Sequence, residues 1–224
     1  MARLARVNLP DIPYHVTQRG NRRQPVFFTE EDRHIYLQLL KSQADRYGLE
    51  VWAYCLMTNH VHLIVVPRAD QALTRAIGET HRRYTRHVNF REGWRGYLWQ
   101  GRFASVPLDE SHLIAAMRYV ERNPVQAGLV NRAEDYQWSS ARSHVLGQPD
   151  AVLASHFLTE QIQDWAEFLR TPEDDRVGTL LARHGSTGRP LGASAFVERL
   201  ESLTGRMLRR GRPGRRARAA VEIR

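Results

Sequence analysis

The sequence predicts an α+β fold for the first half of the chain, and two observations support this class. Short apolar or alternating segments are expected to form strands: residues 14–19, 51–57, 60–66 and 103–106. Two longer segments, 29–48 and 71–89, carry apolar residues at helical spacing. The resulting order of strand, helix, strand, strand, helix, strand is the ferredoxin-like βαββαβ pattern. That fold serves many functions, so it predicts none alone.

The length of 224 residues allows one large domain or one ordinary domain with an extension, and a hydrophobic content of 42% is enough to build a core. Lys and Arg total 33 against 24 Asp and Glu, which gives a net charge of +9. This excess favours a polyanionic partner such as nucleic acid, although basic charge also serves solubility. The single Cys55 excludes an internal disulfide, and no apolar run approaches the roughly 20 residues of a membrane helix. We expect a cytoplasmic, nucleoid-associated protein with no membrane partner.

Polar residues mark the ends of the first elements. Strand 14–19 is followed by the turn pair Gly20-Asn21. The first helix is expected to begin at Thr29, an N-cap residue with Asp32 three residues later, and to end at Gly48.

Strand 60–66 carries His60 and His62 after a short turn at Thr58-Asn59. Two residues is the period of a strand, so both imidazoles project from one face, together with Ile64 and Val66. A His-x-His pair also arises by chance, but here it is a ready pair of metal ligands.

Helix 71–89 carries a basic stripe on the side opposite its apolar residues: Arg75, Arg82 and Arg86. These side chains could lie along DNA phosphates or form an ordinary solvated face, and the sequence favours neither.

A further helix is expected from Asp109, its N-cap, through Arg122. It carries an apolar stripe able to cover the histidine face of the sheet: Leu113, Met117 and Val120. Tyr119 and Asn123 lie four residues apart on its flank, which delivers a hydroxyl and an amide beside the histidines. Each residue also has an ordinary alternative when it is considered alone. Tyr119 could be a half-buried aromatic side chain, and Asn123 could be the end of the helix before Pro124.

Five motifs occur in order along the chain: YHVTQRGNR (14–22), NHVHLIV (59–65), LWQGRF (98–103), RYVERNPVQAGLV (118–130) and WSS (138–140). They resemble motifs of the REP-associated tyrosine transposases, relatives of the single-tyrosine HUH transposases. The resemblance covers residues 8–145. It implies a ferredoxin-like catalytic domain, residues 1–145, that cleaves and rejoins single-stranded DNA at hairpins of repetitive extragenic palindromes.

The same resemblance implies roles for individual residues. Tyr119 would be the nucleophile that forms a 5′-phosphotyrosine, and His60, His62 and Asn123 would be metal ligands. Gln126 is an alternative third ligand. The family implies Mg²⁺ or Mn²⁺, whereas two imidazoles and an amide as donors suit manganese, zinc or nickel better than magnesium. His112, seven residues before Tyr119, is a candidate base or an ordinary surface histidine.

The expected partner is single-stranded or hairpin DNA, bound by a monomer or homodimer. The candidate DNA contacts in the first domain are Arg19, Asn21, Arg22, Arg23, Arg75, Arg82, Arg86, Trp99 and Arg102. Trp99 would stack on an unpaired base, and core packing is its alternative.

Residues 146–205 predict a helical extension, with helices over 159–170, from Thr171-Pro172 to Gly185, and from a Ser194 cap to Gly205. These helices could form a DNA-binding helix-turn-helix module or could simply pack on the catalytic domain, and the sequence leaves both alternatives open. The tail, 206–224, is Arg-rich and expected to be disordered. Its Arg212 and Arg215 are similar to those of an AT-hook in the minor groove, and nonspecific phosphate binding is the alternative.

Two other functions remain possible from the sequence. One is a regulatory protein that keeps the fold and binds DNA hairpins without cutting them. The other is a His-x-His metallohydrolase that is indifferent to Tyr119.

Overall fold

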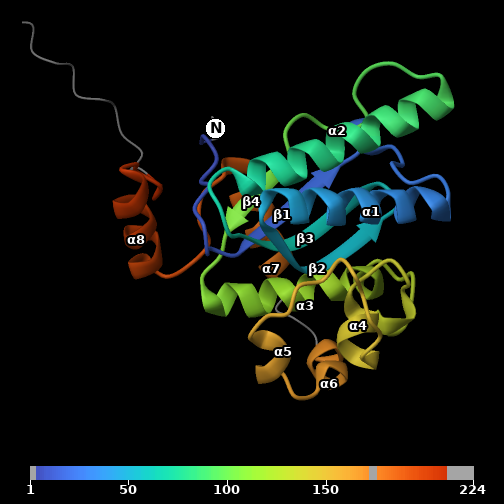
Figure 1. The fold of residues 1–224 in the computed structure, drawn as a ribbon. Coiled ribbons are helices and arrows are strands. Elements are labelled where there is room, and N and C mark those ends of the chain that lie inside the picture. Colours follow the sequence, from blue (N-terminus) through green and yellow to red (C-terminus); the bar gives the residue numbers. More distant parts are fainter. Residues whose placement is uncertain (1–3, 172–175, 211–224) are drawn as a thin grey trace, which may run out of the picture.

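The computed structural model describes residues 4–171 and 176–210, and its centre is a sheet between two layers of helices (Figure 1). The strands are β1 (Tyr14–Arg19), β2 (Leu49–Met57), β3 (His60–Pro67) and β4 (Ala104–Pro107). They pair in the order β2-β3-β1-β4, and every pairing is antiparallel. The predicted α+β class and ferredoxin-like order are confirmed.

Helices α1 (Glu30–Tyr47) and α2 (Ala72–Glu92) cover one face of the sheet. Val61, Leu63 and Val65 of β3 are buried on this side in the same apolar cluster as residues of both helices. The predicted ends of α1 are confirmed. The Thr29 hydroxyl oxygen accepts from the Asp32 N–H at 3.2 Å, and Gly48 ends the helix with φ of +70°.

Helix α3 (Glu110–Gln126) covers the opposite face, which carries the histidines. Ile64 and Val66 pack there in one buried cluster with Leu113, Met117 and Val120. The helix runs beyond the predicted end at Arg122 and contains Pro124. A proline here removes a hydrogen bond from only the last turn, and the N–H groups of residues 127–129 still donate to carbonyls of residues 123–125.

Five further helices follow along the chain: α4 (Ala141–Leu146), α5 (Leu158–Gln161), α6 (Trp165–Arg170), α7 (Arg176–Thr187) and α8 (Ser194–Thr204). Helix α7 contacts α3, β1 and β4, and α6 contacts α3. Packing on the first domain, one of the two predicted alternatives, is therefore observed for α6 and α7.

Three predicted helix boundaries in the extension are wrong. Residues 159–170 do not form one helix, because the chain leaves helical geometry at Ile162 and Asp164 caps a new helix by accepting from the Glu167 N–H at 2.7 Å. Gly185 lies inside α7 instead of ending it. Ser194 is the first residue of α8 and not its cap, since Ala193 holds the cap position and donates its N–H to Asp109 at 2.7 Å.

Two predictions lie partly or wholly outside the described residues. They are the helix start at Thr171-Pro172, where only Thr171 is described, and the distal tail with Arg212 and Arg215. No helix in the described ranges combines the length and apolar character that crossing a bilayer requires.

Candidate active site

A cavity of about 830 Å³ lies on the histidine face of the sheet. Strands β1 and β3 and helices α3 and α7 contribute its walls. Five residues predicted for the chemistry line it: His60, His62, Tyr119, Asn123 and Gln126. Three predicted DNA contacts, Arg19, Arg23 and Arg102, line the same cavity. The structure thus brings together side chains separated by about sixty residues of sequence.

The two histidines of β3 are held with their rings nearly perpendicular, at 82°, and their centroids 4.9 Å apart. The Nδ1 atom of His60 lies 2.6 Å from the Asn59 amide oxygen, so Nδ1 carries the proton and donates it. This tautomer leaves Nε2 as the unprotonated ring nitrogen of His60, the one that could bind a metal. Such an orienting bond on the other ring nitrogen is typical of metal-binding histidines.

His62 is oriented by a third histidine, His15, which the sequence reasoning did not single out. The His15 Nε2 atom lies 2.9 Å from His62 Nδ1, and the rings stack with centroids 5.2 Å apart. The motif at 14–22 contains His15, but its contact with His62 depends on the β1–β3 register, in which Thr17 pairs with His62. The role of His15 could have been predicted from the alternation of side chains along β1 combined with this strand register.

All three histidines are neutral at neutral pH. Burial lowers the pKa of His15 to about 4. Burial, reinforced by the nearby Arg19, lowers the pKa of His60 to about 4, although a hydrogen bond with Asn123 opposes the shift. Burial and the neighbouring histidines hold the pKa of His62 well below its usual value. Neutral imidazoles keep the lone pairs that metal binding requires.

Tyr119 projects from α3 toward the histidines. Its ring meets the His62 ring edge to face, with centroids 5.5 Å apart. Helix α7 closes the other side, because a Cβ added at Gly178 would lie 2.8 Å from Cε2 of Tyr119. Only a glycine lets α7 approach the tyrosine ring this closely. The contribution of α7 to this wall is a second feature that sequence reasoning missed.

Asn123 is buried one turn after Tyr119 and hydrogen-bonds to His60. Within residues 4–171 and 176–210, no group of three or more His, Cys, Asp or Glu side chains has the arrangement of a metal site. A site at the histidine pair would therefore need a donor of another kind. The amide oxygen of Asn123 meets that requirement, so the residues present fit a cation with two nitrogen donors and one oxygen donor.

The segment after β1 projects arginines at the edge of the cavity. Asn21, Arg22 and Arg23 form a short 3-10 turn in which all three side chains are exposed. Arg22 and Arg23 have φ of 53° and 62°, in the left-handed region that costs a non-glycine residue energy. Strained turns of this kind concentrate at binding sites, which agrees with the prediction that these arginines contact phosphates.

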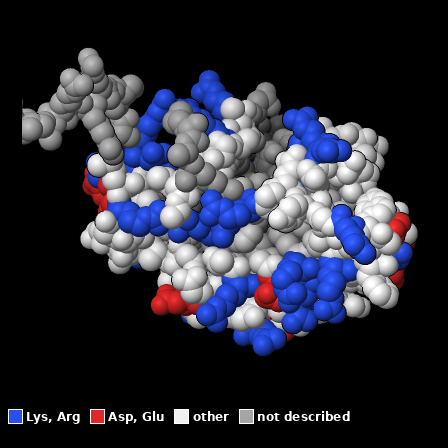
Figure 2. All heavy atoms as spheres, turned by 90° about the horizontal axis from the view of Figure 1, so that it is seen from above, with Lys and Arg blue, Asp and Glu red and all other residues white. Residues whose placement is uncertain are grey.

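The predicted basic stripe on α2 is exposed at Arg75, Arg82 and Arg86. Figure 2 views the molecule from the α2 side of Figure 1 and shows several groups of Lys and Arg, with fewer Asp and Glu than basic residues on this face. Arg82 is partly neutralised by Glu79, with nitrogen and oxygen 2.7 Å apart. This face extends the basic surface beyond the cavity.

Two predicted side chains do not reach the site. Trp99 is only 6% exposed and packs against the rings of Tyr36, His81 and Tyr84, so the base-stacking prediction is wrong and core packing is observed. The backbone pairing of Trp99 with Gly20 draws it into the core. His112 lies at the start of α3, where its Nδ1 is 2.6 Å from Asp109, about two turns from Tyr119.

Comparisons with known proteins agree with this geometry. The model of the family described as "Transposase IS200 like" matches residues 8–123. A protein of Haemophilus influenzae (strain ATCC 51907 / DSM 11121 / KW20 / Rd) named as a REP-associated tyrosine transposase is 27% identical over 111 residues. That match covers 45% of this chain and 63% of the relative, so this chain spans less than two thirds of the relative's length.

The fold is also similar to that of a solved transposase structure. A REP-associated tyrosine transposase bound to a REP hairpin has a TM-score of 0.57 and 19% identity, and the match covers 70% of this chain and 93% of that one. A transposase from Deinococcus radiodurans r1 has a TM-score of 0.38 and 22% identity over 58% of this chain and 97% of that one, too low a score to bear on the fold. The resemblance predicted from the sequence motifs is confirmed, and because the family model matches just over half of its residues, the chain belongs to the IS200-like transposase family.

Proposed function

We propose that this chain is a metal-dependent single-stranded DNA endonuclease and strand transferase that cleaves and rejoins DNA at palindromic hairpin repeats. The observation that carries the proposal is the placement of the Tyr119 ring against His62, with His60 and Asn123 in the same cavity. The solved relative bound to a REP hairpin supports hairpin DNA as the partner.

The proposed ligands are His60, His62 and Asn123, with Gln126 as an alternative third ligand. A bound Mg²⁺ or Mn²⁺ would polarise the phosphate and stabilise the charge that builds on its oxygens. Arg19, Arg23 and Arg102 would bind phosphates of the strand on either side of the cleaved bond, since all three line the cavity.

In the proposed reaction, the Tyr119 hydroxyl oxygen attacks the scissile phosphorus. A bond forms between that oxygen and phosphorus, and the bond to the 3′ oxygen breaks. The phenolic proton goes to solvent, and the departing 3′ oxygen takes one up as a free hydroxyl. The phosphotyrosine link retains the energy of the broken bond, so a 3′ hydroxyl from another DNA end can reverse the step and join the strands without ATP.

A Tyr119→Phe variant tests this proposal. Incubated with Mn²⁺ and a hairpin substrate labelled on the 5′-phosphate side of the cut, the wild-type chain should form a covalent adduct visible on a denaturing gel. The variant should form none, because it lacks the attacking oxygen, and it should bind the hairpin within about twofold of wild type. EDTA should abolish the wild-type adduct.

The possible outcomes separate the alternatives. Normal cleavage by Tyr119→Phe would overturn the assignment of the nucleophile and favour a His-x-His metallohydrolase. Hairpin binding by wild type, without an adduct across several metals and hairpin sequences, would instead favour a regulatory protein that does not cut.

A further inference from the structure

We infer that a second hollow beside the active-site cavity binds unpaired nucleobases of the DNA substrate by stacking them on Trp94 and Tyr97. This aromatic hollow has a volume of about 480 Å³ and includes Phe28, Trp94, Arg95 and Tyr97 in its lining. The inference rests on the proposed function, because it assigns a place to the strand that enters or leaves the active site.

The aromatic side chains of the hollow are unusually exposed for their type. Tyr97 is 88% exposed, Trp94 48% and Phe28 41%. Large apolar side chains grouped at a concave surface mark a binding site more often than isolated ones do. Trp99 is buried, so we assign base stacking to Trp94 and Tyr97, which precede it in the same segment.

The hollow and the active-site cavity share two walls. The segment that follows β1 and the segment that precedes β4 run side by side, because the Asn21 N–H donates to the Leu98 carbonyl and the Gln100 N–H to the Arg19 carbonyl, both at 2.8 Å. Arg23 and Gln100 line the cavity, whereas Gln24 and Leu98 line the hollow. Because the two linings are adjacent along both segments, a strand leaving the cavity across these segments would reach the hollow.

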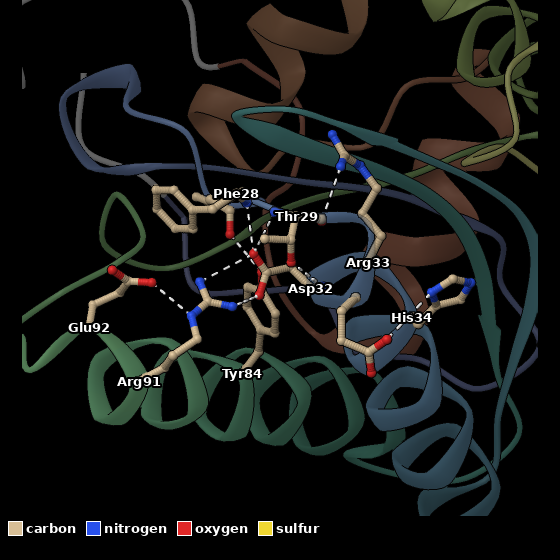
Figure 3. Close-up of polar contacts among 10 residues, drawn as sticks. Phe28, Thr29, Asp32, Arg33, His34, Tyr84, Arg91 and Glu92 are labelled. Carbon is tan, nitrogen blue, oxygen red and sulfur yellow. Dashed lines mark hydrogen bonds and ion pairs between the residues drawn. The ribbon is translucent and has the colours of Figure 1, made fainter.

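A network of polar contacts holds the Phe28 backbone beside the hollow (Figure 3). The buried Asp32 carboxylate accepts from the Phe28 and Thr29 N–H groups at 2.8 and 3.0 Å and pairs with Arg91. The Arg91 guanidinium lies 5.8 Å from the centre of the Phe28 ring. Phe28 in turn meets Trp94 edge to face, with centroids 5.6 Å apart. Rings that are already ordered lose little entropy when a ligand binds.

The loop between α2 and β4 is held from a second side by Asn89. Its carbonyl accepts from the Trp94 N–H at 2.8 Å, and its side-chain amide donates to the Gly96 carbonyl at 2.9 Å. Tyr97 therefore follows a loop with defined backbone contacts, although its own side chain is exposed. Phe28 and the backbone of the loop that carries Trp94 are thus held by contacts within the fold.

Charge indicates which ligand fits. Residues 19–28 and 93–103, which form the shared walls, contain five arginines and no Asp or Glu. Aromatic faces edged by arginines are the usual platform for single-stranded nucleic acid, since the rings stack on bases and the guanidinium groups pair with phosphates. Stacking tolerates any base, so the hollow would hold the unpaired nucleotides next to a hairpin without reading their sequence.

Binding of two matched hairpin DNAs tests the assignment of the stacking site. The two DNAs share one stem, and only one carries an unpaired extension of several nucleotides next to the cleavage site. Fluorescence anisotropy with the full chain should show tighter binding of the extended hairpin by wild type. Tyr97→Ala and Trp94→Ala should each weaken binding of the extended hairpin about 10-fold and leave the blunt hairpin within twofold. Trp94→Phe, which keeps a ring, should retain most of the affinity.

Phe90→Ala is the matched control, because Phe90 is 90% exposed near the same end of α2 but does not line the hollow. It should leave both affinities unchanged. Circular dichroism of each variant checks that the fold is retained, and Tyr97→Ala keeps the test valid if Trp94→Ala unfolds.

Equal loss of both hairpins, or no loss of either, in Tyr97→Ala and Trp94→Ala relative to wild type would overturn the stacking site. Sedimentation showing that the substitutions abolish a dimer while DNA affinity stays constant would assign the patch to self-association and also overturn it. The Tyr119 adduct, measured in the same samples, reports on the proposed function separately. An adduct that forms normally while the aromatic substitutions have no effect means that only the stacking site has failed.

Discussion

His62 offers a single ring nitrogen to the cavity because His15, on the neighbouring strand, occupies the other. The two rings are nearly parallel, with 16° between their planes, so β1 determines how the β3 imidazole is turned. A partner on the second nitrogen selects the tautomer of a ligand and limits its rotation. His15 is therefore expected to act as a positioning residue that contacts neither DNA nor metal.

Replacing His15 should weaken metal binding without removing a ligand. We expect His15→Ala to reduce Mn²⁺ affinity about 10-fold in calorimetry, since losses of this size are usual when an outer partner of a histidine ligand is removed. His15→Gln, which can still hydrogen-bond to His62, should recover part of the affinity. His34→Ala is the control, because His34 is an exposed histidine on α1. Unchanged Mn²⁺ affinity in His15→Ala would rule out the positioning role.

At the scale of elements, the buried carboxylate of Asp32 ties the start of α1 to the end of α2 through Arg91. The same carboxylate forms the capping box with Thr29. Burial alone would raise the pKa of Asp32, but hydrogen bonds from Arg91 and from the Phe28 and Thr29 N–H groups outweigh it and lower the pKa. Asp32 is thus ionised in the folded chain at neutral pH and stabilises both helices.

An Asp32→Asn variant should lose about 1–3 kcal/mol of unfolding free energy at pH 7, because it removes a charged acceptor from buried donors. A carboxyl whose folded pKa is lowered stabilises the fold above its ordinary pKa of about 4 and loses this effect as the pH falls through the lowered value. The difference between wild type and variant should therefore shrink as urea unfolding is repeated from pH 5 toward pH 2.

The exposed Lys41–Asp45 pair within α1 provides a comparison. Asp45→Asn should change the unfolding free energy by no more than about 0.5 kcal/mol, since exposed pairs on one helix contribute little. Equal effects of the two substitutions would show that the Asp32 network has no special role in joining the helices.

For the whole molecule, exposed arginines contribute to the surface on the α2 side. Several groups of Lys and Arg lie on the α2 side (Figure 2), and α6 lies on the other side of the sheet, beyond α3 (Figure 1). A stem of duplex DNA releases counterions when arginines neutralise its phosphates, which makes binding depend on salt. We therefore expect the hairpin stem to bind on the α2 side.

Salt dependence distinguishes a local contact from net charge. We expect the double substitution Arg75→Gln and Arg86→Gln to reduce the slope of log affinity against log salt by about 2, because each phosphate contact contributes about 0.9. The control is Arg132→Gln with Arg170→Gln, which removes the same charge beside η2 (Ala133–Asp135) and on α6. It should leave the slope within about 0.5 of wild type. Equal reductions in both double variants would mean that only net charge matters.

Much of the fold and half of the candidate site were predictable from local patterns. The period of two placed His60 and His62 on one face, Thr29 and Gly48 marked the ends of α1, and helical spacing put Tyr119 and Asn123 on one flank. Each of these signals depends on residues within a few positions of one another. Backbone geometry converts such spacing directly into direction.

Other features arose only where distant segments meet. His15 contacts His62 through strand register, and Gly178 of α7 reaches Tyr119 across the packing of an extension whose helix ends were partly mispredicted. Trp99 and Trp94 both lie in one Gly- and Trp-rich segment, yet one is buried and the other exposed. Nothing in their immediate neighbours distinguishes them, because burial depends on which surfaces the folded chain brings against each ring.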